Sequence, residues 1–407
     1  MTLGNSTMLS VAATTGPGGL LALIRSGEAV TRAQIMAVTG LSRSTVAQRL
    51  DALIAHGYIA PAASESSTGG RPPGAFQINA DAGVMLLAAI GAGAMQVAVC
   101  DMSRTILARQ SHGVSVADGP IAVLGEVMAH FDQLLAEVKR TRADVKGIGI
   151  GVPGLVDARS GRSYSSPVFG EREIPIAAML GDRTGLPVKL EKPANLLALA
   201  ESWFGYAQSE KSFAVVALDQ TASLGLWVES DLHRGASTLG PTFGHVKVSG
   251  TGRTCDCGQT DCLNAYFSHA AMRRDAAARL GEAFAATTLA RTDIVAALAE
   301  ACDAGLAGAR ELVDEQGARL GMAVSHVVNL INPEKIIVAL ESARYSALVA
   351  PALKAAVEAN SFRAHFAATQ LIFHTLDEQL WARGAAALML RDVYSAPWTS
   401  GYQEEKK

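Results

Sequence analysis

One histidine and three cysteines between positions 245 and 262 carry the clearest chemistry in the chain. His245 is followed by Cys255, Cys257 and Cys262. Three sulfur donors and one nitrogen form a closed tetrahedral set of the kind that a structural zinc ion takes. Gly258 follows Cys257 where the loop must turn, and glycine accepts a positive φ without strain. We predict a zinc site with no catalytic role, because the four donors leave no coordination position open.

Two other interpretations of the cysteines are a disulfide bond and buried cysteines without a metal. The chain has five cysteines, an odd number, and its first residues lack the basic start and apolar core of a secretory leader. A disulfide framework is therefore disfavoured, and we expect a reducing, cytoplasmic protein. No apolar run reaches the roughly 20 residues that a membrane helix needs.

Composition favours two or three domains with large cores. The chain has 407 residues, of which 49% are hydrophobic and 18% charged. The net charge is −3, but residues 1–80 carry five arginines against three acidic residues, a net of +2, so the remainder carries −3 − 2 = −5. This asymmetry is typical of a small DNA-facing domain on an acidic body.

Residues 1–80 predict a winged helix-turn-helix. A first helix runs to Gly27, a second spans 32–39 with Ile35 and Val38 facing inward, and a third spans about 43–56. Thr31 and Ser42 are the expected N-caps. The third helix should bury Val46, Leu50, Leu53 and Ile54. Two short strands around a Gly/Ser-rich segment, 64–73, then complete a hairpin wing.

Hydroxyl, amide and guanidinium groups cluster at the start of the third helix. Such groups bind base edges and phosphates when this helix enters the major groove. Arg71, in Gly69-Gly70-Arg71-Pro72, is suited to a narrow minor groove. The predicted DNA contacts are Arg32, Ser42, Arg43, Ser44, Thr45, Gln48, Arg49 and Arg71. The alternative is a small packing or dimerisation domain.

From residue 81 onward, strands alternate with helices, which indicates an α/β body with mixed sheets in two lobes. Buried strands are expected at 84–100, with a bend at Gly91 and Gly93, and at 145–152, 186–190, 213–218, 225–229 and 335–340. Helices are expected at 121–140, 194–204, 268–280, 292–304 and 309–330.

These features together resemble a regulator of the ROK family, whose members include repressors and sugar kinases. The resemblance rests on the wing motif 68–72, on the strand and turn 147–157, and on Phe243-Gly244-His245 with the three cysteines. It implies two ribonuclease-H-like, actin-like lobes with a cleft between them, and a homodimer or tetramer. The expected domains are 1–80 (winged helix-turn-helix), 81–195 (first lobe) and 196–407 (second lobe with the zinc loop), with the last helix free to return to the first lobe.

The departures from the family's kinases concern the groups that perform phosphotransfer. Ala89–Ala94 lacks the aspartate and threonine of the first phosphate loop. Pro193 stands where the kinases have the catalytic aspartate, and proline cannot accept a proton. Asp219 replaces a glycine-rich turn and would repel a triphosphate. Ala339-Leu340-Glu341 replaces the late nucleotide-side glycines. We therefore predict that the chain is not an enzyme.

The residues that match the family's sugar site are partly altered. Thr242 and Asn264 stand where the family has glutamates, and Lys192-Pro193 replaces an Asn-Asp pair. Sugars are recognised by polar groups that take paired hydroxyls. The candidate effector contacts are Glu191, Asn195, Thr242, His245 and Asn264. The effector is expected to be a sugar or sugar derivative, unless the pocket has lost its ligand.

The prediction is a DNA-binding transcriptional regulator, a repressor, of carbohydrate metabolism. Two-fold pairing would place two recognition helices about 34 Å apart on double-stranded DNA, so the operator should be a rough palindrome. The alternatives are a sugar kinase with an appended DNA-binding domain and a dimeric regulator without a ligand.

Overall fold

The structure is a computed structural model of the chain. It describes residues 17–62, 74–91, 93–115, 117, 119–170, 173–218, 220–248, 250–281, 284, 293–376 and 379–395. The chain divides into two compact units, Met1–Pro193 with Trp381–Lys407 and Ala194–Leu380. Each unit contains a five-stranded mixed sheet with helices, so the predicted α/β class is confirmed.

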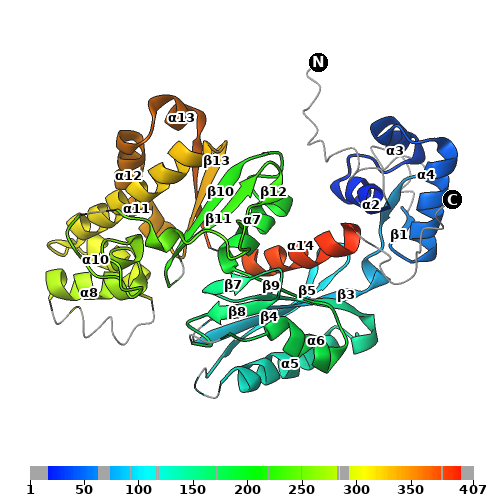
Figure 1. Ribbon diagram of the computed structural model, residues 1–407, viewed down its shortest axis with the longest axis horizontal. Coiled ribbons are helices and arrows are strands. Elements are labelled where there is room, and N and C mark those ends of the chain that lie inside the picture. Colours follow the sequence, from blue (N-terminus) through cyan, green and yellow to red (C-terminus); the bar gives the residue numbers. More distant parts are fainter. Residues whose placement is uncertain are drawn as a thin grey trace. The chain divides into compact units, whose positions relative to one another are not determined.

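In the described residues between 17 and 78, the first unit has three helices and a two-stranded antiparallel sheet (Figure 1). Leu20, Leu21, Ile35, Leu50 and Leu53 are fully buried and form its core. Residues 63–73, which include Arg71 and the tip of the predicted wing, lie outside the described residues. The elements are α2 (Pro17–Ser26), α3 (Arg32–Thr39), α4 (Arg43–Ala55), β1 (Ile59–Pro61) and β2 (Phe76–Ile78).

Two predicted core positions in this part are wrong. Val38 is 46% exposed and Ile54 is 37% exposed. Each short helix around this small core buries only a narrow row of side chains. On α3, Ile35 is the residue of that row that is fully buried. On α4 the row ends at Leu53, and Ile54 lies beyond its edge.

The first large sheet has the strand order β5-β4-β3-β6-β9. β3 and β4 are antiparallel and joined through Gly91 and Gly93, as predicted, while β6 runs parallel to both β3 and β9. The strands are β3 (Val84–Ile90), β4 (Ala94–Asp101), β5 (Ile106–Gly113), β6 (Val145–Gly151) and β9 (Val188–Glu191); a small hairpin, β7 (Leu155–Asp157) and β8 (Arg162–Ser165), follows β6.

Helices cover both faces of this sheet (Figure 1). Apolar residues of α5 (Gly119–Glu137) and α6 (Ile176–Thr184) share one core with alternate residues of β3 and β6. On the opposite face lies α14 (Leu380–Ser395), the last helix. It approaches so closely that a Cβ on Gly149 would lie 3.0 Å from the carbonyl oxygen of Ala385.

The second unit contains a sheet of order β12-β11-β10-β13-β14. Helix α7 (Pro193–Phe204) lies against one face, where a Cβ on Gly225 would meet the carbonyl oxygen of Ala194 at 2.2 Å. The strands are β10 (Phe213–Leu218), β11 (Ala222–Val228), β12 (Asp231–Leu232), β13 (Lys335–Leu340) and β14 (Gln370–Thr375).

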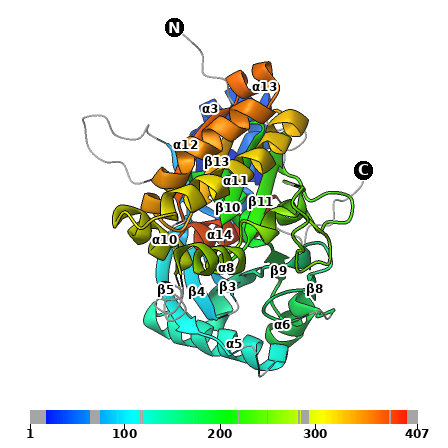
Figure 2. The same ribbon diagram turned by 90° about the vertical axis from the view of Figure 1, so that its left-hand side faces the viewer.

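The other face of this sheet is covered by helices from the later part of the chain, which stand in front of the strands in Figure 2. They are α8 (His269–Leu280), α10 (Ile294–Asp303), α11 (Ala309–Ile331), α12 (Ala343–Asn360) and α13 (Arg363–Ala368). Their apolar side chains share a core with β10 and β13. Among the helices in the described ranges, none combines the length and apolar character needed to cross a membrane.

Candidate metal centre and nucleic-acid interface

The four side chains predicted as metal ligands lie together in the second unit. The potential ligand atoms of His245, Cys255, Cys257 and Cys262 all fall within 4.8 Å of one another. Sγ of Cys255 lies 3.7 Å from Nδ1 of His245, and Sγ of Cys257 lies 3.8 Å from Sγ of Cys262. Cys255 and Cys262 are buried, whereas His245 and Cys257 are exposed.

These separations fit one tetrahedral ion. With metal–sulfur bonds of about 2.3 Å, the sulfurs of a tetrahedral site stand about 3.8 Å apart, and a sulfur and an imidazole nitrogen about 3.5 Å. The observed 3.8 Å and 3.7 Å are close to both values. The cluster can therefore hold a metal through its own four side chains.

Short backbone contacts hold the ligand segments in place. His245 ends the 3-10 helix η4 (Phe243–His245), and Cys262 precedes η5 (Leu263–Ala265). Lys247 forms an isolated antiparallel bridge with Cys262, which brings these two segments side by side. Between them, Thr254 pairs with Thr260, and a turn from Cys255 to Gly258 closes with a 2.8 Å hydrogen bond. The Gly258 φ of 82° is the left-handed value expected for this turn. We call residues 251–262 the metal loop.

The surroundings of the sulfurs differ. Burial raises the pKa of the Cys255 thiol to about 11. A hydrogen bond from the Gln259 backbone N–H lowers the pKa of Cys257, and the positive charge of Lys247 acts in the same direction. Nζ of Lys247 lies 3.6 Å from Sγ of Cys262 and also donates to the Thr260 carbonyl. The sequence interpretation overlooked Lys247, because its place beside the sulfurs depends on the bridge to Cys262.

The candidate DNA-binding face begins at the N-terminus of α4. Gly40, at φ 69°, ends α3, and the side chain of Ser42 caps α4 by accepting from the Thr45 N–H at 3.2 Å. Thr31 and Gln34 form a reciprocal capping box on α3. Gly40 and Ser42 fix the turn between the two helices, and Thr31 caps the start of α3, as the sequence predicted.

Most of the predicted DNA contacts lie on an accessible surface. Ser42, Arg43, Ser44 and Gln48 are exposed, whereas Thr45 and Arg49 are half-buried. The hydroxyl groups of Ser44 and Thr45 lie 2.9 and 2.8 Å from that of Ser42, so three hydroxyls stand side by side at the helix start. This arrangement offers neutral donors and acceptors beside the Arg43 guanidinium.

Arg32 has partners inside the domain. Its Nη2 lies 3.7 Å from the Asp51 carboxylate of α4, and its guanidinium lies 5.5 Å from the centre of the Phe76 ring on β2. Arg32 therefore connects α3, α4 and the strand that follows the wing. It also offsets the negative charge of Asp51 on the exposed side of α4.

The candidate effector residues fall in both units. Glu191, at the end of β9 in the first unit, is 1% exposed, and its Oε1 accepts from the Lys192 N–H at 2.9 Å. In the second unit, Asn195 on α7 is also 1% exposed, whereas Thr242 is exposed. Oδ1 of Asn264 accepts from the Ala222 N–H at 3.1 Å. Its side chain lies against Gly244, where a Cβ would be 2.2 Å from Nδ2. Asn264 thus joins the start of β11 to the segment that carries His245.

Among the positions that differ from the kinases, two have clear structural roles. Pro193 is the first residue of α7, where a helix needs no N–H donor. Glu341 follows β13, and its carboxylate lies 2.9 Å from Nε2 of His269 at the start of α8. Ala92 and Asp219 lie outside the described residues.

Comparisons with known proteins match both parts of the chain. Residues 87–392 match the ROK family, and residues 20–62 match the IclR helix-turn-helix domain. The xylose repressor of Caldicellulosiruptor bescii is 22% identical over 382 residues, which covers 93% of this chain and 96% of the repressor.

Solved structures show the same fold. A crystal structure of a ROK family transcriptional regulator, homologous to the E. coli MLC protein, has a TM-score of 0.81 at 22% identity and covers 95% of this chain and 98% of that one. A ROK hexokinase from Thermus thermophilus has a TM-score of 0.61 at 23% identity and covers 76% of this chain and 99% of the hexokinase. The regulator therefore matches nearly the whole chain, and the kinase about three quarters of it.

Proposed function

The chain belongs to the ROK family, and from this premise we propose that it is a DNA-binding transcriptional repressor that responds to a carbohydrate-type effector. The observation that carries the proposal is the capped helix α4, which presents exposed Ser42, Arg43, Ser44 and Gln48 within a segment that matches a helix-turn-helix domain. Relatives named as repressors support the same reading.

The DNA contacts proposed are those of the sequence analysis. Arg43 and Gln48 would reach base edges, while the three hydroxyls at the helix start would contact phosphates. Arg32 is better placed to hold α3, α4 and β2 together than to reach a base, because Asp51 and Phe76 already contact it. Arg49, half-buried, and Arg71, in the wing, complete the proposed set.

Fluorescence anisotropy on a duplex from the region upstream of the chain's own gene tests this proposal. Arg43→Ala should weaken binding by about 5- to 150-fold, the effect of losing one good base-reading pair. Arg159→Ala, an exposed arginine in the turn between β7 and β8, is the matched control and should bind as the unaltered chain does. Absence of binding at low salt would refute the proposal.

For the effector, we propose a sugar or sugar derivative that contacts Asn195, Thr242, His245 and Asn264 in the second unit. Glu191, in the first unit, stays a prediction of the sequence alone. Several relatives are named as xylose or N-acetylglucosamine repressors, which supports this chemical class. A thermal-shift screen over sugars and sugar phosphates should find a ligand that raises the melting temperature and also weakens DNA binding. Thr242→Ala should reduce the rise in melting temperature that the ligand causes, because it removes a proposed ligand contact. The Thr242 side chain caps no helix, so the substitution should not disturb the fold itself. If no sugar or sugar phosphate in the screen raises the melting temperature, the result would favour the alternative of a regulator without an effector.

We further propose that the chain has lost phosphotransfer. Pro193 offers no general base, and the carboxylate of Glu341 stands at the end of β13, where a triphosphate would meet like charge. A coupled assay with ATP and a panel of sugars should release no ADP above the background without sugar. Sugar-dependent turnover would favour the kinase alternative.

The proposed metal is zinc, held by His245, Cys255, Cys257 and Cys262. Three thiolates and one imidazole match the ligands and geometry of structural zinc sites, and they leave no position open for substrate. When bound, the ion would connect His245 to the turn that carries Cys255 and Cys257 and to Cys262 at the end of the metal loop. Elemental analysis should find about one zinc per chain.

We propose that the active form is a homodimer or a tetramer built from dimers. Paired α4 helices about 34 Å apart would read a roughly palindromic operator. Light scattering with and without operator DNA measures this directly, and a monomer bound to a single half-site would contradict it.

A further inference from the structure

Tyr266 lies at the junction between the metal loop and two helices of the second unit. The side chain is 1% exposed, and its hydroxyl donates to Oδ1 of Asp261 at 2.6 Å. The Asp261 carboxylate also accepts from the backbone N–H groups of Gly252 and Arg253, at 3.0 and 3.2 Å. Because Asp261 precedes the ligand Cys262, this carboxylate joins the two strands of the loop at its base.

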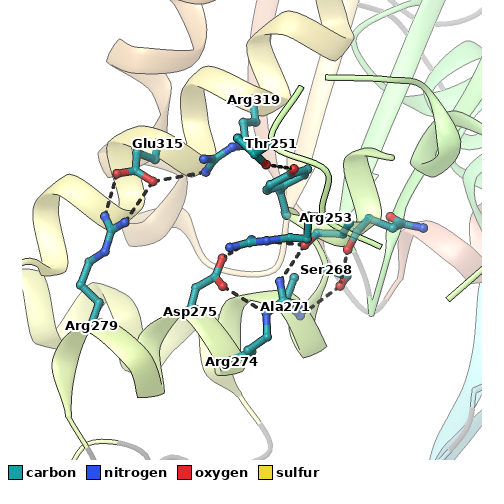
Figure 3. A network of polar contacts seen from close by, with 12 residues as sticks. Thr251, Arg253, Ser268, Ala271, Arg274, Asp275, Arg279, Glu315 and Arg319 are labelled. Atoms are coloured by element: carbon teal, nitrogen blue, oxygen red, sulfur yellow. Dashed lines mark hydrogen bonds and ion pairs between the residues drawn. The ribbon is translucent and has the colours of Figure 1, made fainter. Parts of the chain in front are cut away.

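Two guanidinium groups lie over the Tyr266 ring. Arg253, on the metal loop, is 4.5 Å from the ring centre, and Arg319, on α11, is 4.7 Å from it. Figure 3 shows these arginines approaching from different elements. A cation over a buried aromatic ring is attracted more strongly than at an exposed site, because less water competes with it.

Ion pairs extend the contacts into both helices. Arg253 donates to Asp275 of α8 at 2.8 Å. Arg319 donates to Glu315 of α11 at 3.4 Å, and Glu315 also accepts two hydrogen bonds from Arg279 of α8, at 2.8 and 3.2 Å. Figure 3 shows the ion pairs of Arg253, Arg279 and Arg319. With the contacts of Arg253 and Arg319 at Tyr266, they form a closed circuit that runs from the metal loop to α8, to α11 and back to Tyr266.

The metal loop has little regular structure of its own. In place of a ladder of paired strands, it is held by isolated bridges at Lys247–Cys262 and Thr254–Thr260, by single hydrogen bonds such as that from the Asp261 N–H to the Arg253 carbonyl, and by the Asp261 carboxylate. A metal joined to all four ligands would therefore supply much of its order. Without that order, Arg253 and Asp261 would lose their fixed positions, and Tyr266 would lose contacts on the loop side.

We infer that Tyr266 is a positioning residue that couples the metal loop to α8 and α11, so that metal binding stabilises both helices as well as the loop. The inference rests on the proposed metal site. Tyr266, Arg253 and Arg319 would together transmit the order of the metal loop to the two helices, which none of them would do without the others.

Hydrogen–deuterium exchange of the full chain tests the coupling, in excess zinc and after removal of zinc by a chelator. Chelation should speed exchange in α8 and α11 by about 2- to 30-fold, the factor expected from losing a contact of cation–π strength. Peptides from α5, which lies in the first unit, should not change. Unchanged exchange in α11, while the metal loop itself opens, would overturn the inference.

Two variants separate this role from simple packing. Arg319→Met keeps an unbranched apolar chain on α11 but removes the cation, so the response of α11 to chelation should weaken, with only the route through Arg279 and Glu315 left, while α8 responds as before. Tyr266→Phe keeps the ring and removes the bond to Asp261, so the response of both helices should weaken. A full α11 response in Arg319→Met would contradict the proposed route. Zinc content, measured on the same samples, separates failure of the proposed metal site from failure of the coupling. A chain without zinc refutes both. A zinc-loaded chain whose α11 exchange does not change on chelation refutes the coupling alone.

Discussion

Lys247 balances the charge of the proposed metal site. Three thiolates and one Zn²⁺ carry a net charge of −1, and Nζ of Lys247 lies 3.6 Å from Sγ of Cys262. Its positive charge is one of the causes that lower the pKa of the Cys257 thiol. Partners just outside a metal's ligands commonly change its affinity by about 10- to 100-fold.

We expect Lys247→Met to weaken zinc binding by about 10- to 100-fold in competition with a chromophoric chelator. Lys247→Arg, which keeps the charge, should lose much less. Equal zinc affinity for Lys247→Met and the unaltered chain would show that this ammonium group is not needed.

Cys257 is the ligand whose replacement tests the metal site most cleanly, because it is exposed and leaves no cavity in the core. Cys257→Ser should lower the zinc content well below one per chain and should lower the melting temperature. Cys302→Ser, a half-buried cysteine on α10 outside the cluster, is the control. Normal zinc content in Cys257→Ser would contradict the proposed ligand set.

The sequence predicted that these four side chains cluster, because few residue types bind zinc and their spacing is short. Lys247, Asp261 and Tyr266 could not be predicted in the same way. Their roles depend on the bridge between residues 247 and 262 and on the contact of Arg319 of α11 with Tyr266. No sequence pattern indicates either of these contacts. Asn264, taken for an effector contact, also has a backbone partner that spacing does not indicate.

At the scale of elements, α11 and α12 pack closely because of two glycines. A Cβ on Gly321 would lie 2.4 Å from the carbonyl oxygen of Leu353, and one on Gly317 would lie 2.8 Å from that of Val349. Neither carbonyl can move without shifting α12. The close contact of these helices therefore depends on the missing side chains.

Gly321→Ala should destabilise the chain by about 1–3 kcal/mol in chemical denaturation, the usual cost of overpacking, despite the better helix propensity of alanine. Gly125→Ala on α5 should instead be neutral or stabilising by up to about 1 kcal/mol, since its Cβ would meet nothing closer than 4.0 Å. A neutral Gly321→Ala would mean that the two helices separate readily.

Strongly patterned elements were predictable, and weakly patterned ones were not. The buried strands 84–90, 145–151, 213–218 and 335–340 follow from stretches made mostly of apolar residues and glycine. β5 and β14 were not predicted, because both are edge strands and much of their surface is polar or half-buried. α12 was also missed, although its N-cap Ser342 gives a helix start signal.

At the scale of the whole molecule, the two units combine a DNA-binding segment with a body shared by regulators and kinases. The sequence indicated both parts, because the helix-turn-helix and the cysteine cluster are local motifs. It left open whether the last helix returns to the first lobe, and in the structure Trp381–Lys407 belongs to the first unit although the preceding 187 residues, Ala194–Leu380, form the second. Such a return depends on contacts like that of Gly149 with Ala385, which are distant in the sequence.

Hydroxyl-radical footprinting on the region upstream of the chain's own gene tests the central claim, that α4 binds DNA, most directly. The account predicts two protected patches about one helical turn, or about 10 base pairs, apart. At the same protein concentration, Arg43→Ala should weaken this protection and Arg159→Ala should preserve it. No protection at low salt, or protection that Arg43→Ala leaves intact, would contradict it.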